Sequence, residues 1–308
     1  MNLPEHAVTP TPLDMSAPPA PPEGEPPLWP EIRSLIEHDI ASQPRSLQRE
    51  LGPSEIGTDC PHCLAAKLAG WDQHPTPGWL PFIGTCVHEH FERLFNRLSN
   101  QPEYRNRWKS ELAVDVAPLY RIDGSGYDIH GHIDLWDQQA HATCDWKIVG
   151  DTTLRQVKAH GPSQTYLTQA SLYGLGLTRQ GETVRRSCIY YLPRNAMTLD
   201  KAIPWEQPFD PKPGKWAINR LRLLRTLLDI IEQAEGKAGR DQWISLLPRS
   251  QSHCFDCATW ADTPLVDGLP NKIPDTSIPL PERWTRLIPL IQPNYQPTTS
   301  QTEKENQQ

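Results

Sequence analysis

The chain has 308 residues and a formal net charge of −7, and 37% of its residues are hydrophobic. No stretch approaches the ~20 apolar residues of a membrane span, and no basic region followed by an apolar run opens the chain, so we expect a cytoplasmic protein rather than a membrane or secreted one. The acidic excess lies at the two ends and leaves residues 33–260 formally neutral, so charge neither supports nor excludes a nucleic-acid partner.

The two ends differ in composition from the middle. Residues 1–30 hold ten of the 33 prolines and no Lys or Arg, and residues 261–308 hold eight more and finish in a polar run. Such segments bury too little apolar surface to offset the entropy lost on ordering. We therefore expect an acidic, Pro-rich disordered tail over 1–30 and a Pro- and polar-rich tail over 261–308, largely disordered or loosely docked. One folded domain is predicted over 31–260.

The middle of the chain alternates between two kinds of apolar spacing. Helical spacing predicts helices over 31–40, 63–69, 84–98, 164–177 and 216–234. Alternation and β-branched or aromatic content predict strands over 110–116, 126–136, 142–149 and 185–192, with the second and third forming a hairpin. Residues 78–82 read as a loop. This order predicts an α/β fold in which helices flank a mixed sheet.

Two acids stand close together in the predicted hairpin. In Cys144-Asp145-Trp146-Lys147, strand alternation puts Asp145 and Lys147 on one face. Asp134 lies on the preceding strand, where its carboxylate can approach that of Asp145. Two close carboxylates repel unless a cation or proton lies between them, so the pair outlines a site for a hard divalent cation. Each motif alone also fits a simpler role, such as a surface salt bridge.

Two helices bracket the hairpin with further polar groups. His88 opens the strong helix over 84–98 and could supply an imidazole to the same cation. Gln169 and Tyr173 lie one turn apart on the helix that follows the hairpin, and both suit a phosphate or a catalytic water network.

The order of these elements is more specific than any one of them. Gly-x-x-x-His on a helix, Gly-x-x-Asp on a strand, Asp-x-Lys on the next strand and Gln-x-x-x-Tyr on the next helix resemble the RecB-like branch of the PD-(D/E)XK nuclease superfamily. The resemblance covers about residues 50–195. Short motifs such as Gly52-Pro-Ser-Glu-Ile-Gly and Tyr191-Leu-Pro-Arg-Asn resemble those of exonucleases encoded by actinobacterial phages. Those enzymes are similar to the iron–sulfur exonucleases of CRISPR adaptation.

The resemblance implies a restriction-endonuclease-like core and a role for each motif residue. His88, Asp134 and Asp145 would bind Mg²⁺ or Mn²⁺, and the backbone carbonyl of Trp146 could add a further ligand. Lys147 would position or activate the attacking water. Gln169 and Tyr173 would support the DNA or the lysine. Glu55 and Glu92 are lesser candidates, for which a helix-end or solvated role is the simpler interpretation.

Four of the seven cysteines form two Cys-x-x-Cys pairs, Cys60/Cys63 and Cys254/Cys257. Two such pairs supply the four thiolates of an iron–sulfur cluster or a zinc ion. The RecB-like branch includes enzymes with one cluster cysteine before the core and three after it, and the resemblance therefore implies a 4Fe-4S cluster here. Because the split in this chain is two and two, zinc and unliganded thiols stay open as alternatives. His62 and His253 adjoin the pairs. We expect the remaining cysteines to be buried small hydrophobic residues.

Basic and aromatic residues outside the motifs are candidate DNA contacts. Arg220, Arg222 and Arg225 lie on the predicted helix over 216–234 and could contact phosphates, although a packed or solvated role is more common for such residues. Trp71, Trp79 and Trp108 lie in or near predicted loops and could stack on unpaired bases.

The leading hypothesis is a metal-dependent exonuclease that acts on DNA with single-stranded ends in phage replication or recombination, in the host cytoplasm if phage-encoded. Proteins of those processes would be its partners. The alternatives are a structure-specific endonuclease on the same core, and a non-catalytic DNA-binding protein with a zinc knuckle. The sequence leaves the oligomeric state open.

Overall fold

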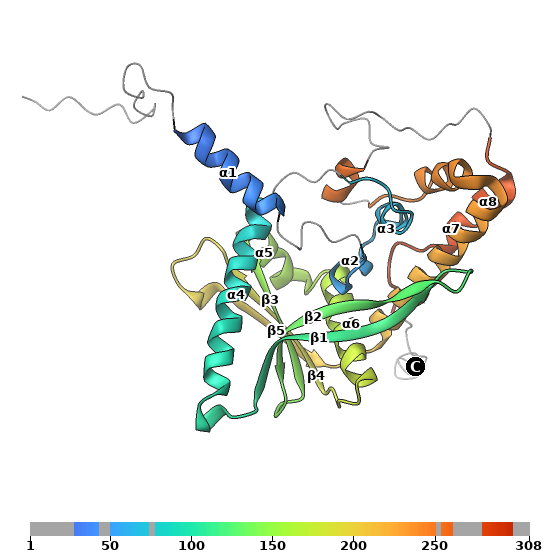
Figure 1. The fold of residues 1–308 in the computed structure, drawn as a ribbon. Coiled ribbons are helices and arrows are strands. Elements are labelled where there is room, and N and C mark those ends of the chain that lie inside the picture. The colour runs from blue at the N-terminus through green and yellow to red at the C-terminus, as the bar shows by residue number, and fades with distance from the viewer. Residues whose placement is uncertain (1–27, 43–49, 74–77, 251–253, 261–278, 298–308) are drawn as a thin grey trace, which may run out of the picture.

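The computed structural model describes residues 28–42, 50–73, 78–250, 254–260 and 279–297, arranged around a five-stranded sheet of order β1-β2-β3-β4-β5 (Figure 1). The β3–β4 pair is parallel, and the other three pairs are antiparallel. The strands are β1 (Trp108–Tyr120), β2 (Gly126–Asp137), β3 (Ala142–Val149), β4 (Arg186–Pro193) and β5 (Ile203–Pro208). The mixed sheet flanked by helices that the sequence predicts is confirmed.

Helices cover the sheet unevenly. The α-helices are α1 (Trp29–Ser42), α2 (Pro53–Ile56), α3 (Pro61–Leu68), α4 (Trp79–Ser99), α5 (Asp151–His160), α6 (Gln164–Arg179), α7 (Lys212–Ser245) and α8 (Glu282–Thr285). On one face, Tyr166 of α6 meets Tyr191 of β4; on the other, Phe95 of α4 stacks on Trp146 of β3. Asp145 and Lys147, which alternate with Trp146, therefore belong to the α6 face.

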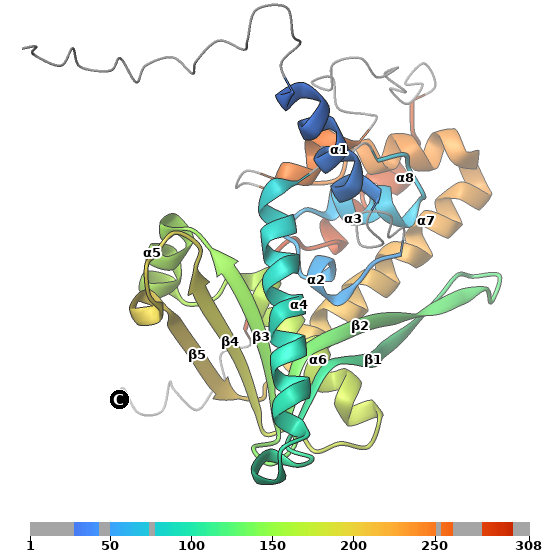
Figure 2. The ribbon, with the colours of Figure 1, turned by 60° about the vertical axis from the view of Figure 1, so that its left-hand side comes forward.

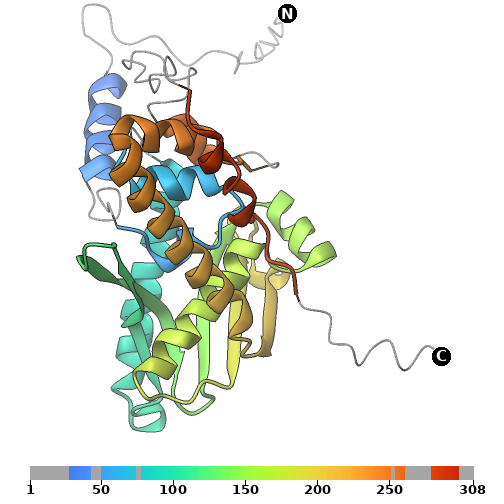
Figure 3. The same cartoon turned by 90° about the vertical axis from the view of Figure 1, so that its right-hand side faces the viewer.

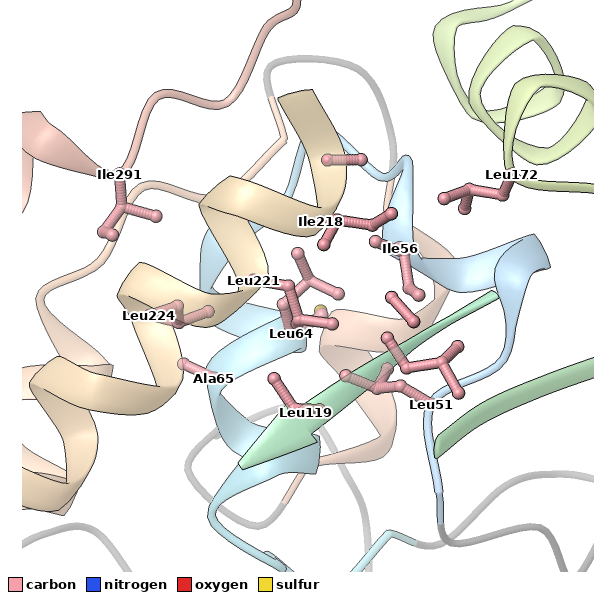
Figure 4. Packing of buried hydrophobic residues seen from close by; sticks show 14 of the residues in the cluster. Leu51, Ile56, Leu64, Ala65, Leu119, Leu172, Ile218, Leu221, Leu224 and Ile291 are labelled. Atoms are coloured by element: carbon pink, nitrogen blue, oxygen red, sulfur yellow. The ribbon is translucent and has the colours of Figure 1, made fainter. Parts of the chain in front are cut away.

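The largest core cluster joins α7 to segments far away in sequence. Leu221 and Leu224 of α7 are fully buried beside Leu64 and Ala65 of α3 (Figure 4). Figure 3 shows the C-terminal described segment running beside α7, and the Trp243 indole donates to the Trp284 carbonyl at 2.9 Å. Residues 279–297, part of the segment expected to be largely disordered or loosely docked, thus pack onto the domain.

The β1–β2 ribbon leaves the plane of the other strands. Figure 2 shows it diverging from β3, with α4 crossing in front. Its far end is tied to α7, because Asp229 accepts hydrogen bonds from the Ile122 amide at 3.1 Å and pairs with Arg121 at 3.0 Å. The ribbon is therefore attached at both ends and free of the sheet between them.

Some elements differ from the prediction. Helix α4 begins at Trp79, where a loop was expected over 78–82, because Pro81 falls in the first turn and a helix tolerates proline there. Strand β5 was not predicted, since its two prolines are acceptable only on the edge that it occupies. Helix α5 was not predicted either, because Leu154 and Val157 alone anchor it.

Most of the tail predicted over 1–30 and most of the one predicted over 261–308 lie outside the described residues. The first helix, α1, begins at Trp29, inside the segment predicted as a disordered tail. Among the helices that the structure describes, none is long and apolar enough to cross a membrane.

Candidate active site

A fork between two strands creates the candidate site. β2 and β3 hydrogen-bond only where Leu135–Asp137 face Ala142–Cys144, and beyond these residues the strands part. The first residue past the fork is Asp134 on β2 and Asp145 on β3. We call this divergence the strand fork. A continuous ladder of hydrogen bonds would close the gap between the strands. Because the strands part, the carboxylates of Asp134 and Asp145, the predicted pair, have space at the strand fork.

His88 reaches the strand fork from α4. Its Nδ1 lies 3.3 Å from Oδ1 of Asp134, and its Nε2 lies 3.1 Å from the Trp146 carbonyl. The Trp146 amide donates to Oδ2 of Asp134 at 2.7 Å. If Nε2–H donates to the carbonyl, the Nδ1 lone pair is directed to the side where Asp134 lies, which is the arrangement of an imidazole ligand held by a second hydrogen bond.

A second chain of contacts starts at Asp145. Lys147 Nζ lies 2.6 Å from Oδ2 of Asp145 and donates to Oε1 of Gln169 at 2.9 Å. The Gln169 amide donates to the Tyr173 hydroxyl at 2.9 Å. All six predicted catalytic residues therefore line one cavity of about 520 Å³. The ammonium of Lys147 also lies over the Tyr166 ring, 4.8 Å from its centroid.

The negative charges of the pocket carboxylates are only partly compensated by neighbouring positive groups. Burial raises the pKa of Asp145 to about 6, and the charge of Asp134 acts in the same direction against the opposing effect of Lys147. Oδ1 of Asp145 is buried without a hydrogen-bond partner in the described part of the chain. For His88, burial lowers the pKa, but the hydrogen bond and charge of Asp134 outweigh it and leave the pKa raised. A buried oxygen without a donor fits a site that completes its contacts with a cation.

Glu111 of β1 is the pocket residue that sequence reasoning missed. Ligand atoms of His88, Glu111 and Asp134 all lie within 4.8 Å of one another. In the sequence, Glu111 is one acid in a weakly alternating strand and resembles a solvated surface residue. The signal that could have found it is the pairing of β1 with β2, which puts it opposite Asp134.

Helix α2 forms one wall of the pocket. A Cβ added to Gly131 of β2 would lie 2.6 Å from Cγ of Pro53 and 3.0 Å from Cε1 of Tyr173, so only glycine allows this close approach. Glu55, a lesser candidate, closes the first turn of α2 by accepting from the Gly52 amide at 3.0 Å, and it pairs with Lys67. Glu92, the other lesser candidate, lines the pocket.

The four predicted cysteines form a cluster, which we call the cysteine clip. Cys60 Sγ lies 3.4 Å from Cys63 Sγ and 3.6 Å from Cys257 Sγ; Cys63 Sγ lies 3.6 Å from Cys254 Sγ and 3.5 Å from Cys257 Sγ. These sulfurs can bind a metal. The clip joins segments about 190 residues apart in sequence, which costs closure entropy that metal binding offsets.

The surroundings of the clip are buried and polar. His62 is fully buried; its Nδ1 lies 4.0 Å from Cys63 Sγ, and its Nε2 lies 3.2 Å from an Arg249 nitrogen. His253 lies outside the described residues. Of the other three cysteines, Cys144 and Cys188 are buried as predicted, whereas Cys86 is exposed on α4, and that prediction is wrong.

Two of the arginines considered as phosphate contacts are interior residues. Arg220 donates to four main-chain carbonyls, those of Ile56, Thr58, Gln292 and Pro293, and tethers the segment before the clip and the C-terminal segment to α7. Arg225 is 5% exposed and bonds Asp229 and the Leu68 carbonyl. Buried guanidiniums with these partners stabilise the fold and cannot reach DNA.

The remaining candidate contacts are partly engaged within the protein. Arg222 is exposed and donates to the Pro118 carbonyl at 3.1 Å. Trp71 and Trp108 are half-buried, with indoles that donate to Asp241 and Asp137. Trp79 is 57% exposed at the start of α4.

Comparisons with known proteins place the chain in no family. No family model matches it, and no curated protein does. Among solved structures, one match is the crystal structure of SSO0001, with a TM-score of 0.42 and 12% sequence identity over 63% of this chain and 87% of that one. The description of the site therefore depends on its own geometry.

Proposed function

We propose that the chain is a divalent-metal-dependent deoxyribonuclease with a RecB-like PD-(D/E)XK site, and that it acts as an exonuclease on DNA ends. The observation that carries this proposal is the arrangement at the strand fork. An imidazole from α4 and carboxylates from β2 and β3 line one cavity, with the ammonium of Lys147 beside Asp145. The partnerless buried oxygen of Asp145 supports a cation rather than an internal salt bridge as the reason for the cluster.

The donor set suits Mg²⁺ or Mn²⁺, and His88, Asp134 and Asp145 would hold it. The Trp146 carbonyl, expected as a further ligand, lies instead against Nε2 of His88. Such a cation, when bound, polarises a phosphate oxygen and lowers the pKa of a bound water. Lys147 is positioned to orient the attacking water or to stabilise negative charge on the phosphate. Gln169 fixes the lysine through its carbonyl oxygen, and Tyr173 in turn fixes the Gln169 amide.

The acidity of the pocket also bears on the order of binding. Carboxylates repel the phosphates of DNA, so the anionic backbone enters favourably only after these charges are neutralised. This requirement predicts that DNA hydrolysis, and close binding of DNA at the strand fork, depend on the divalent cation.

For the cysteine clip we favour zinc over a 4Fe-4S cluster. Four thiolates around one zinc ion form a tetrahedron with edges of ~3.8 Å, given Zn–S bonds of ~2.3 Å. The sulfur separations of 3.4–3.6 Å are close to this value. A cubane cluster binds each thiolate to a different iron at a different corner, which requires more widely separated sulfurs. Metal analysis of the purified protein decides: zinc supports this assignment, whereas iron with sulfide and broad visible absorption contradicts it.

A nuclease assay with two matched variants tests the main proposal. End-labelled linear and circular single-stranded DNA are incubated with Mn²⁺, with Mg²⁺ or with EDTA. The enzymes are wild type, Asp145→Asn and Asp151→Asn, the last being an exposed acid at the start of α5. We expect metal-dependent loss of linear DNA only, a rate lower by about 10²–10³-fold for Asp145→Asn, and an unchanged rate for Asp151→Asn.

The other outcomes separate the alternatives. Cutting of circles supports a structure-specific endonuclease on the same core. DNA binding without metal-dependent hydrolysis by the wild type contradicts the nuclease proposal and supports a non-catalytic DNA-binding protein.

A further inference from the structure

We infer that Glu111 is a further ligand of the strand-fork cation, and that the set it completes with His88 and Asp134 selects Mn²⁺ over Mg²⁺. This inference rests on the proposed metal site and assigns it a residue outside the four motifs.

Position is the first observation. Ser110 pairs with Leu135 and Leu112 with Ile133, so Glu111 stands opposite Asp134 across the β1–β2 ladder. Its carboxylate lines the same cavity as Asp134 and His88, and one ligand atom from each of the three lies within 4.8 Å of the other two. A single ion at bonding distance from all three donors fits this spacing.

Backbone conformation is the second observation. Glu111 has φ +46° in the interior of a strand, one of three non-glycine residues with positive φ in the described chain. A side chain makes this left-handed conformation unfavourable, and an extended residue would continue β1 without the penalty. Asn106 and His141, the other two, lie in connections outside the strands, whereas Glu111 is strained within the pocket wall. Strain that directs a carboxylate to a cation site has a functional reason.

The charge around the site is the third observation. Asp145 is 4% exposed and lines the same cavity with a buried oxygen that has no partner among the described residues. The cavity is lined by five carboxylates, those of Glu89, Glu92, Glu111, Asp134 and Asp145, and by a single ammonium, that of Lys147. Cation binding relieves this excess of negative charge, because like charges in a partly buried site repel strongly.

The ligand types indicate which cation is preferred. Mg²⁺ retains several waters and typically takes one or two carboxylates, while imidazole ligands suit transition metals. A set of one imidazole and three carboxylates, those of Asp134, Asp145 and Glu111, therefore favours Mn²⁺. Removing the Glu111 charge lowers the affinity for Mn²⁺ and leaves the imidazole preference in place.

Calorimetric titration with MnCl₂ and MgCl₂, without DNA, tests the inference. For Glu111→Gln we expect the Kd for Mn²⁺ to rise by about 10–100-fold. For the control Glu89→Gln, an exposed acid that lines the cavity but lies outside the ligand group, we expect less than a two-fold change. Wild type should bind Mn²⁺ more tightly than Mg²⁺. Equal affinities for Glu111→Gln and Glu89→Gln overturn the ligand role, and tighter Mg²⁺ binding overturns the selectivity.

Asp134→Asn separates this inference from the function on which it rests. If Asp134→Asn weakens Mn²⁺ binding and Glu111→Gln does not, the inference alone is wrong. If neither variant changes Mn²⁺ binding, the proposed metal site itself is wrong.

The melting temperature of Glu111→Gly distinguishes a ligand role of Glu111 from a purely structural role. Glycine adopts φ +46° without strain, so in EDTA this variant should melt at or above the wild-type temperature. Mn²⁺ should raise the melting temperature of the wild type and have little effect on the variant. A variant that melts lower in EDTA and keeps the full Mn²⁺ shift overturns the inference.

Discussion

The strand fork and the cysteine clip both gather metal-binding side chains, yet they differ in donor type, burial and sequence spacing. The strand fork offers oxygen and nitrogen donors in an open cavity, where His88, Glu111 and Asp134 are half-buried. In the clip, Cys60 and Cys63 are buried and the donors are sulfur. The two sites are close in sequence: Pro53, which begins α2 and lines the first site, lies in the same short segment as Cys60, where the second site starts.

On the proposed assignments, one short segment would serve two metals with different tasks. An open site with hard donors can exchange its cation and admit a substrate, whereas four thiolates, two of them buried, hold a metal much more firmly. We therefore expect substitutions at the clip to change stability and substitutions at the strand fork to change catalysis.

The largest effect is expected at the clip. Cys63→Ser should abolish metal retention and lower the free energy of unfolding by roughly 5 kcal/mol or more, because structural zinc contributes on the order of 10 kcal/mol to folding in small domains. Urea denaturation and zinc content measure both quantities. Cys86→Ser, at the exposed cysteine of α4, is the matched control and should keep the metal. Equal stability of the two variants would refute a structural clip.

The opposite pattern is expected for the lysine of the strand fork. Lys147→Met should lower the rate of DNA hydrolysis by about 10²–10³-fold, since it removes the positive charge beside the reacting phosphate. Its retention of zinc should equal that of the wild type. Lys158→Met on α5 serves as control. A variant with full activity would remove Lys147 from the mechanism.

The pH dependence of stability should carry the signature of Asp145. Because its pKa is raised from 3.8 to about 6, the folded protein holds a proton that the unfolded chain has already released. The metal-free protein should therefore lose stability as pH rises from about 4 to about 6, by about 3 kcal/mol. Asp145→Asn should lack this component.

The measurement is the difference between the urea unfolding free energies of wild type and Asp145→Asn, each in EDTA across this pH range. Taking the difference cancels the other titrating groups. A difference that does not vary with pH would show that Asp145 has an ordinary pKa.

A smaller effect should appear where α2 lies against the strand fork. Gly131→Ala places a methyl group 2.6 Å from Pro53, so α2 must shift, at a cost of about 1–3 kcal/mol. We expect a several-fold loss of nuclease activity with zinc retained. Gly84→Ala on α4, where an added Cβ meets nothing within 4 Å, should leave activity unchanged. Similar behaviour of the two variants would mean that α2 does not shape the pocket.

Much of the candidate site could be predicted because its residues belong to short, local sequence motifs. Both acids and the lysine occur in two short motifs, Gly131-His132-Ile133-Asp134 and Asp145-Trp146-Lys147. Strand alternation assigns Asp145 and Lys147 to one face of the sheet. Glu111 could not be found this way. Its proposed role depends on which residue stands opposite it and on a backbone angle that the sequence does not reveal.

The arginines of α7 teach the converse. Arg220 and Arg225 look like surface charges in the sequence, because arginine is seldom buried without partners. Their partners are main-chain carbonyls of segments distant in sequence, such as Ile56 and Leu68. Periodicity within α7 cannot reveal contacts of this kind.

The attachment of the β1–β2 ribbon at both ends has a mechanical consequence. One end is fixed by the three-residue ladder to β3, and the other by Asp229. Because the ribbon is held at both ends, β2 cannot readily pair further with β3 or move away from it. At the proposed metal site, the scaffold would therefore set the spacing between the acids of β2 and β3 before a cation binds, so that binding would cost little reorganisation energy.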